Sequence, residues 1–397
     1  MSTSSARRPP LGFLMLLGTM AAVPAMTMDM YLPSLPEMTR DLNTTQALVQ
    51  GTISGVMIGS AMGSLLSGPL SDRFGRRRPF FAGMALHVVM SVLAAISPNI
   101  TTLLAVRVLQ GMGNATATIA AFSALRDRFT GPSQSSGMSW IQTVIAVVPL
   151  AAPAVGGWIA HHWGWRAVFI ALAVFGLVVM AMVALLLEET HPPERRNPNA
   201  SPIRAFGPLV RDPRFLAVAV VPAMATTVLF TYISASSFVL QEGFGLTPAQ
   251  FVIAFAVNGV MIIVGAQANS RLVYRVGTPR MLWVGLLGSL LFAALLLVAS
   301  LTGIGGLWGF LVPLALLLVF NFLTMPNAVT LALKHHGRRA GSAAALVTAT
   351  QQLLAGILSP FVAVLGGGAP AMSIVLLAAV LVALLFAALN RRLERRA

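Results

Sequence analysis

Apolar runs of about 20 residues recur along almost the whole 397-residue chain, separated by short stretches rich in arginine, proline or glycine. A helix needs a run of about this length to cross the hydrocarbon core of a membrane. Lipid permits only helices or closed barrels, and barrel strands would alternate over about 10 residues, a pattern that is absent. Only 9% of the residues are charged, against about 25% in soluble domains. The sequence therefore predicts an all-α integral membrane protein.

Polar residues, prolines and glycines divide the chain into twelve predicted membrane-spanning helices. Their approximate ranges are 11–36, 46–70, 79–97, 100–124, 135–160, 166–187, 214–240, 248–269, 280–301, 306–332, 340–365 and 369–390.

A hydrophilic segment with six prolines follows the sixth span and cannot form one continuous helix. It predicts a first six-helix bundle over 1–187, a linker over 188–213 and a second six-helix bundle over 214–397. The loops SDRFGRRRP (71–79) and NSRLVYRVGTPR (269–280) occupy matching places in the two halves, and each places a glycine before an arginine. Duplicated six-helix halves are typical of secondary transporters.

Basic residues indicate the orientation of the spans. All 26 lysines and arginines lie in every second loop or at the chain ends, except Arg40, Arg107 and Arg166. Because cytoplasmic loops of membrane proteins carry the excess of lysine and arginine, both termini are expected in the cytoplasm. This pattern also explains the formal net charge of +15 without a nucleic-acid partner.

Two charged residues lie well inside predicted spans, Asp29 in the first and Arg107 in the fourth. Placing a charged side chain at the bilayer centre costs at least about 2.5–3.5 kcal/mol of free energy. Each of these residues therefore needs an oppositely charged or hydrogen-bonding partner, a water-filled cavity or a functional role. Both lie roughly 10 Å below the same end of the bundle, so they either meet or share a cavity. Two interpretations stay open: a static ion pair that fixes packing, and a proton-responsive acid tuned by the arginine. Asp127 is a weaker second candidate acid.

Spans four and five contain further unusual residues. Gln110 and Asn114 are polar within span four, which is compatible with interhelical hydrogen bonds or with cavity lining. Span five carries two prolines and a glycine pair, which is typical of a kinked helix at a moving or sealing interface. The hinge candidates are Pro149, Pro153, Gly156 and Gly157, and the candidate substrate-cavity residues are Met30, Tyr31, Gln110, Asn114, Phe230, Tyr232, Asn258 and Asn321.

The stretch Gly68–Pro79 joins spans two and three. Positive-inside bias explains its arginines, but it explains neither Asp72 nor Gly75. An acid at this helix end is suited to hold arginines or the N-terminus of a neighbouring helix. We expect the stretch to latch the cytoplasmic gate.

Several classes of function find no support in the sequence. The chain has no cysteine, so it has neither disulfides nor a thiolate metal site. The paired histidines at 161–162 and 335–336 lack acidic partners, which makes a metal site improbable. No catalytic triad, phosphate-binding loop or carboxylate pair is visible, so an enzyme is not expected. The N-terminal apolar helix is interpreted as an uncleaved first span.

These residues resemble the major facilitator superfamily, and within it the drug/proton antiporters of the Bcr/CflA type. GPLSDRFGRRRP (68–79) is similar to the signature loop of the superfamily, and DMYLPSLP (29–36) to the first-span motif of the subfamily. RVLQGMG (107–113) resembles the span-four motif. PLAAPAVGG (149–157) resembles the antiporter motif of span five, with alanine at 152 where glycine is usual. The resemblance extends over all twelve spans.

The resemblance implies the major facilitator fold, with two pseudo-symmetric six-helix bundles. It implies that Asp29 is the proton-linked acid and Arg107 the functional arginine of span four. Some relatives have a second acid about two turns before the first, where this chain has Ala21–Ala22, so neutral or singly charged amphiphiles such as phenicol-type antibiotics fit better than dications. The implied gate residues are Gly68, Asp72, Arg73, Gly75 and Arg76, and the implied hinge residues are Pro149, Pro153, Gly156 and Gly157.

The predicted function is proton-coupled efflux of small amphipathic drugs by alternating access, with protons as coupling ion and no cofactor. The alternative is export of an endogenous metabolite, such as an amino-acid or sugar derivative. The expected protein is monomeric, lies in a bacterial cytoplasmic membrane among lipids and binds no nucleic acid. A sensor or scaffold is disfavoured because the sequence shows no soluble domain or long tail.

Overall fold

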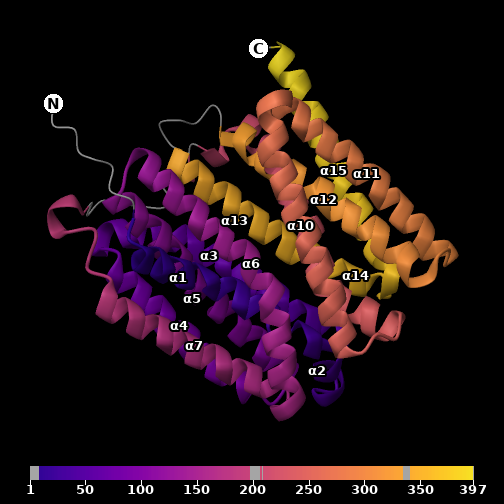
Figure 1. Cartoon of the computed structure of the whole chain (residues 1–397), viewed down its shortest axis with the longest axis horizontal. Coiled ribbons are helices and arrows are strands. Elements are labelled where there is room, and N and C mark those ends of the chain that lie inside the picture. The colour runs from indigo at the N-terminus through magenta and orange to yellow at the C-terminus, as the bar shows by residue number, and fades with distance from the viewer. Residues whose placement is uncertain (1–8, 197–205, 208, 334–339, 397) are drawn as a thin grey trace.

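The computed structural model describes residues 9–196, 206–207, 209–333 and 340–396. The described residues form helices and no strands, which confirms the predicted all-α class (Figure 1). The middle of the predicted linker, 197–205, lies outside the described residues, as do Lys334, Arg338 and Arg339.

The first half of the chain contains α1 (Leu11–Asp29), the 3-10 turn η1 (Leu32–Ser34), α2 (Leu35–Asp41), α3 (Gln46–Phe74), α4 (Arg77–Ala95), α5 (Ile100–Arg128), α6 (Gly131–Trp163), α7 (Trp165–Leu186) and η2 (Pro193–Arg195). The second half contains α9 (Pro213–Phe238), the π-helical turn η3 (Val239–Gly243), α10 (Pro248–Val276), α11 (Thr278–Thr302), α12 (Gly306–Leu333), α13 (Ala340–Leu358), α14 (Phe361–Val364) and α15 (Gly368–Arg396).

The predicted first span, 11–36, lies within one candidate membrane span, Leu11–Asp41, but it is not one unbroken helix. Helix α1 ends at Asp29, the chain turns through Met30 and Tyr31, and helical structure resumes in η1 and α2. Proline at 33 and at 36 removes backbone donors that a continuous helix would need. The predicted span 340–365 is likewise divided, between α13 and α14, at Pro360.

Most other helices run past their predicted ends, because helical structure continues into polar residues beyond the apolar run. Helix α3 reaches Phe74 and α5 reaches Arg128. Eleven helical segments of the described chain are long and apolar enough to span a membrane. Helix α5 is not among them, since its middle carries Arg107, Gln110 and Asn114. All three are buried, because α5 packs against α1, α3 and α4.

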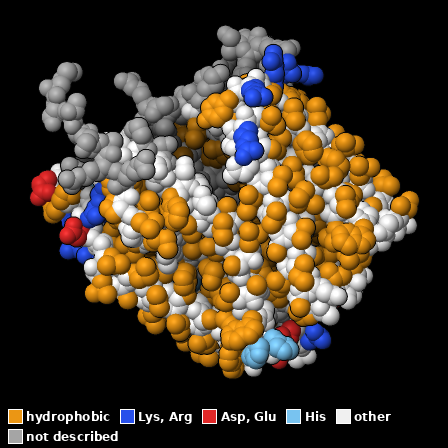
Figure 2. Space-filling view, in the orientation of Figure 1, with side chains coloured by type: hydrophobic (Ala, Val, Ile, Leu, Met, Phe, Trp, Pro, Cys, Tyr) orange, Lys and Arg blue, Asp and Glu red, His pale blue; other side chains and the backbone are white. Residues whose placement is uncertain are grey.

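The bundle has two chemically different ends. We call the end where α3 passes into α4 the arginine-rich end, and the end where α2 passes into α3 the opposite end. Helix α1 starts at the arginine-rich end; α15 starts at the opposite end, where Gly367 lies against Gln46, and returns. In Figure 2, blue lysine and arginine side chains lie mainly at the top and the left edge of the view, with one at the lower right, and apolar side chains cover most of the face between them.

The two halves contact each other mainly through α3 with α13 and α6 with α10. Further links lie toward the opposite end. The Ser237 hydroxyl of α9 donates to the Leu32 carbonyl oxygen at 2.7 Å, and the Gln241 amide of η3 donates to the Pro33 carbonyl oxygen at 3.1 Å. The Leu32 carbonyl oxygen also accepts from the Leu35 amide, so the bond from Ser237 is an additional link that ties the second half to the backbone after α1.

Helix α6 approaches the end of α1 most closely at Gly156. A Cβ atom at this position would lie 1.7 Å from the Met30 carbonyl oxygen, so only glycine fits. At the next residue, Gly157, a Cβ would meet Pro33 at 3.5 Å, an ordinary van der Waals distance. Pro149 and Pro153 lie within the continuous helix α6. The glycine pair therefore presses against the turn that follows Asp29.

We expect Gly156→Ala to lower the free energy of unfolding by about 1–3 kcal/mol, because α1 and α6 must move apart to admit the methyl group. Gly157→Ala is the matched control, with little effect expected. Thermal unfolding of the two purified variants in the same detergent measures the difference. Equal stability of the two variants would contradict the close approach of α6 to Met30.

Candidate functional site

The break at the end of α1 creates the first element of the site. A helix terminus leaves its last carbonyl groups without partners inside the helix. Here the Met30 amide donates to the Met26 carbonyl oxygen, and the Arg107 guanidinium of α5 donates to the Thr27 carbonyl oxygen at 3.1 Å. A cation at a helix C-terminus also complements the helix dipole. Arg107 thus caps the broken first helix.

Arg107 is fully buried and joins several helices. Its guanidinium donates to the Thr52 carbonyl oxygen of α3 at 3.4 Å and to the Gln110 side-chain oxygen at 2.6 Å. The same group lies 4.5 Å from the ring centre of Tyr31 and 5.4 Å from that of Phe169 in α7. The arginine is held by carbonyl oxygens and aromatic faces, which favour a cation without adding a negative charge.

Asp29 and Arg107 do not form an ion pair, although both belong to the described residues. Of the two alternatives left open, a direct contact and a shared cavity, the direct ion pair is therefore absent in this conformation. The reason is the backbone: Asp29 is the last residue of α1, and Arg107 bonds to the carbonyl group two residues earlier.

The Asp29 carboxyl group is buried, with 3% of the residue exposed, and its Oδ1 atom has no hydrogen-bond partner among the described residues. Tyr232 of α9 lies close enough to interact electrostatically with Asp29 and with Asn258 of α10. The Tyr232 hydroxyl and the Asn258 amide nitrogen are also buried without partners. An unpartnered Asp29 oxygen of the first half thus lies near the Tyr232 hydroxyl of the second half, and Asn258 lies beside Tyr232.

Other predicted residues have structural partners. Gln110 donates to the Ser91 hydroxyl at 2.7 Å while it accepts from Arg107, so it serves interhelical hydrogen bonding, one of the two interpretations left open. The hydroxyls of Tyr31 and Thr52 lie 2.9 Å apart. Asn114 is the exception: it is fully buried beside His87, and neither its amide nitrogen nor its amide oxygen has a hydrogen-bond partner among the described residues.

In the second half, Tyr232 stacks on Phe255, with ring centres 5.4 Å apart. The Asn321 amide donates to the Ala225 carbonyl oxygen at 3.0 Å. Phe230 is half-buried and packs against the large apolar core.

A cavity of about 340 Å³ lies between the halves, toward the arginine-rich end from Asp29. It contains no charged side chain and combines apolar surface with hydroxyl groups and one amide. None of the eight candidate cavity residues named from the sequence lines it. Its walls are formed by Ala21, Pro24, Ala25, Ser60, Ser64, Ala115, Thr118, Ile119, Phe122, Ile145, Ala345, Thr348 and Gln352.

At the arginine-rich end, Arg76 forms the centre of the predicted gate. Its guanidinium contacts Asp127 of α5 at 2.8 Å, Asp72 of α3 at 2.7 Å and the Ser71 hydroxyl at 3.1 Å. Burial alone would lower the pKa of Arg76, but the hydrogen bonds to Asp127 and Asp72 hold that pKa above its ordinary value. Asp127 is thus a partner of the gate arginine.

Gly75 makes the turn between α3 and α4, with φ +89, a conformation that favours glycine. Arg73 lies over the Phe74 ring, with its guanidinium carbon 5.1 Å from the ring centre. Gly68 has open space where a side chain would stand, so it contacts no part of the Arg76 cluster. The side-chain partners of Arg76 are Asp127, Asp72 and Ser71, and they do not include Arg73.

Glu189, which the sequence did not single out, completes the loop. One carboxylate oxygen accepts from the Arg76 and His191 amides at 2.9 and 3.0 Å, and the other accepts from the Arg77 amide at 3.2 Å. Burial would raise the pKa of Glu189, but these backbone donors hold it below its ordinary value. A carboxylate at a helix N-terminus is stabilising, and an acid soon after span six was the available signal.

The profile of the Major Facilitator Superfamily matches residues 16–360 of the chain. The chain belongs to this superfamily. It is therefore a membrane transporter, not an enzyme.

Superfamily relatives match most of the chain. It is 34% identical over 365 residues to the uncharacterized MFS-type transporter YdgK of Bacillus subtilis (strain 168), covering 89% of each chain. It is 30% identical over 353 residues to the bicyclomycin resistance protein homolog of Haemophilus influenzae, covering 88% of each. It is 26% identical to multidrug resistance protein D of Escherichia coli (strain K12), covering 90% of each.

Solved structures share the fold. A D-xylose-proton symporter matches with TM-score 0.75 and 16% identity, over 94% of this chain and 97% of that chain. The peptide transporter POT matches with TM-score 0.74 and 18% identity, over 97% of this chain and 95% of that chain. These matches agree with the predicted major facilitator fold of two helical halves.

We expect Arg107→Lys to lower the free energy of unfolding by at least about 1.5–3 kcal/mol, because an ammonium cannot reproduce the guanidinium bonds to Thr27, Thr52 and Gln110. Arg166→Lys, at a partly exposed ion pair with Asp41, is the control and should change little. Thermal unfolding in detergent makes the comparison. A Lys variant as stable as the wild type would show that the cap on α1 does not depend on the guanidinium.

We expect Glu189→Ala to destabilise the protein by about 0.5–2 kcal/mol at neutral pH, since the amides of Arg76 and Arg77 lose their acceptor. Because the pKa of Glu189 is lowered on folding, this contribution is present above the ordinary glutamate pKa and is lost as the pH falls through the lower folded value. The difference in melting temperature between wild type and variant should therefore shrink in acid. Glu188→Ala, at a largely exposed side chain, should show no such trend.

Proposed function

We propose that this transporter exports small amphipathic compounds in exchange for protons, by alternating access. The observation that carries the proposal is the buried Asp29 carboxyl group, which has an unpartnered oxygen and lies near the second half. A buried carboxyl group without a compensating cation is costly when ionised, so proton binding is favoured there. A bound proton and a bound compound then act at the same interface between the halves.

The names of two relatives support drug efflux as the transported class: a bicyclomycin resistance protein homolog and multidrug resistance protein D. The chemistry of the cavity agrees with that class. Its apolar walls suit an amphipathic body, its hydroxyl groups suit hydrogen-bonding substituents, and it offers no charge to hold a dication. Neutral or singly charged compounds, including phenicol-type antibiotics, are the proposed substrates.

The proposed orientation places the arginine-rich end and both termini in the cytoplasm of a bacterial cell. The hydrogen bonds from Ser237 and Gln241 to the backbone after α1 then seal the outer side. The 340 Å³ cavity lies toward the cytoplasmic side, where a compound enters. We propose that the protein works as a monomer surrounded by lipid, because each chain contains both halves.

In the proposed cycle, the compound enters from the cytoplasm while Asp29 releases its proton to that side. The halves then rock, so the contacts at Ser237 and Gln241 open and the Arg76 cluster latches the inner end. Asp29 takes a proton from outside as the compound leaves. We propose that the helix break at Asp29 and the close contact of Gly156 with Met30 allow the bending that this rocking requires.

We expect Asp29→Asn to abolish export driven by a pH gradient, because the amide has no proton to exchange, while the protein still inserts and folds. The matched control is Asp41→Asn, a partly exposed acid at the opposite end. Liposomes containing the purified protein, loaded with a phenicol and given a pH gradient, report both compound and proton movement. Undiminished pH-driven export by Asp29→Asn would refute the assignment.

A panel of antibiotics, amino acids and sugar derivatives, tested in the same liposomes, separates drug export from metabolite export. Transport of metabolites alone would replace the proposed substrate class but keep the mechanism.

A further inference from the structure

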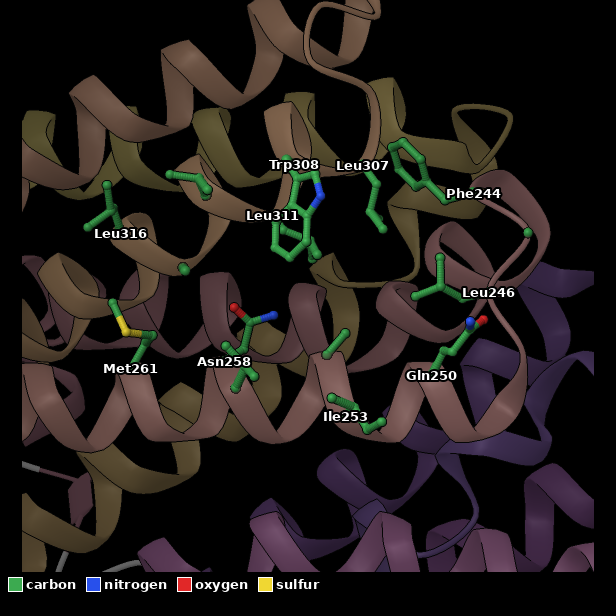
Figure 3. Close-up of a pocket in the computed structure, with 15 residues that line it drawn as sticks. Phe244, Leu246, Gln250, Ile253, Asn258, Met261, Leu307, Trp308, Leu311 and Leu316 are labelled. Atoms are coloured by element: carbon green, nitrogen blue, oxygen red, sulfur yellow. The ribbon is translucent and has the colours of Figure 1, made fainter.

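A larger cavity lies within the second half, on the side of α10 and α12. It holds about 640 Å³ and is bounded by α10, α12 and the residues that follow η3 (Figure 3). Its rim is strongly exposed: 65% of Ile253, 55% of Val257 and 71% of Trp308 are accessible. We call it the α10–α12 groove. Because large apolar side chains are exposed along its rim, the groove faces the lipid.

Asn258 is the unusual residue of this groove. The side chain extends from α10 toward α12 (Figure 3), and only 2% of the residue is exposed. Its amide nitrogen has no partner at full hydrogen-bond geometry among the described residues, and the Tyr232 hydroxyl, which also lacks such a partner, lies beside the Asn258 side chain. A buried donor without an acceptor is unfavourable, so the position is suited to a ligand that supplies one. The other polar residue of the lining, Gln250, already accepts from the Thr247 amide at 2.9 Å.

We propose that the α10–α12 groove is a binding site for an uncharged, apolar small compound dissolved in the membrane, held by one oxygen acceptor that receives the Asn258 amide. The volume lies within the range of about 300–1,000 Å³ that is usual for small-molecule sites. The lining carries no charged side chain, which excludes a charged group as the recognised feature. The site is separate from the cavity between the halves, but Asn258 also lies beside Tyr232, the neighbour of Asp29.

A phospholipid chain is a poorer occupant than a small compound. Asn258 lies ten residues into α10 from Pro248, roughly 15 Å from the helix start. At that depth an acyl chain offers only methylene groups, which leave the amide without an acceptor. A compact ketone, ether or alcohol carries its oxygen into the hydrocarbon region, where that oxygen can accept a hydrogen bond from the Asn258 amide.

Photolabelling with benzophenone tests the site, because this probe is uncharged and apolar and its ketone is both the acceptor and the photoreactive group. The full-length protein in lipid nanodiscs is illuminated with the probe, and labelled peptides are quantified by mass spectrometry. We expect labelling to concentrate on 253–261 and 307–316, above the level on the lipid-exposed residues Leu185 and Leu186 of α7.

We expect Asn258→Leu to lower labelling in the groove by about five- to tenfold, the value of one hydrogen bond. Gln267→Leu also replaces an amide with leucine, but at an exposed position of α10 outside the groove. Labelling in the groove should be unchanged in this variant. Ala315→Phe, which fills the groove and keeps Asn258, should also abolish the excess, so the test survives if the Asn258 variant fails to fold.

Two results would overturn the proposal. Labelling in the groove no higher than on α7 would show that no site exists. Strong labelling that is equal in wild type and Asn258→Leu would show that benzophenone enters the groove only because it partitions into the lipid, and that Asn258 recognises no acceptor.

Discussion

The bonds from Arg107 to the broken end of α1 organise the first half of this transporter. A helix that stops inside a membrane leaves carbonyl groups that lipid cannot satisfy. One guanidinium reaches the Thr27 carbonyl of α1, the Thr52 carbonyl of α3 and Gln110 of its own helix, so three helices are fixed at one point. The cost of burying the cation is offset by oxygen acceptors and by two aromatic faces.

This arrangement frees Asp29 from its expected partner. Because Arg107 binds backbone and not carboxylate, the Asp29 side chain remains unpartnered and lies near Tyr232 of the second half. The same irregular backbone receives hydrogen bonds from Ser237 and Gln241 and packs against Gly156 of α6. The end of α1 is thus the place where both halves and the acid meet, which is the geometry that proton-linked rocking of the halves would require.

The charges at the arginine-rich end form a separate cluster, many helical turns from Asp29. Arg76 is balanced by Asp127 and Asp72, while Glu189 accepts from the first amides of α4. In this conformation every one of these partners belongs to the first half. Among the described residues, the cluster therefore stabilises the turn between α3 and α4 through partners of the first half alone.

The amino-acid sequence by itself determined the class of fold and the few polar residues inside the spans, because hydrocarbon tolerates so few alternatives that apolar length is decisive. It also singled out Asp29, Arg107 and Arg76. Their partners depended on the tertiary structure. The positions of backbone groups in space decide three features. Helix α1 ends at Asp29, Arg107 donates to the Thr27 carbonyl oxygen and not to the Asp29 carboxylate, and Glu189 accepts from the first amides of α4. Sequence spacing places side chains along a helix, but only packing decides which neighbour satisfies a buried polar atom.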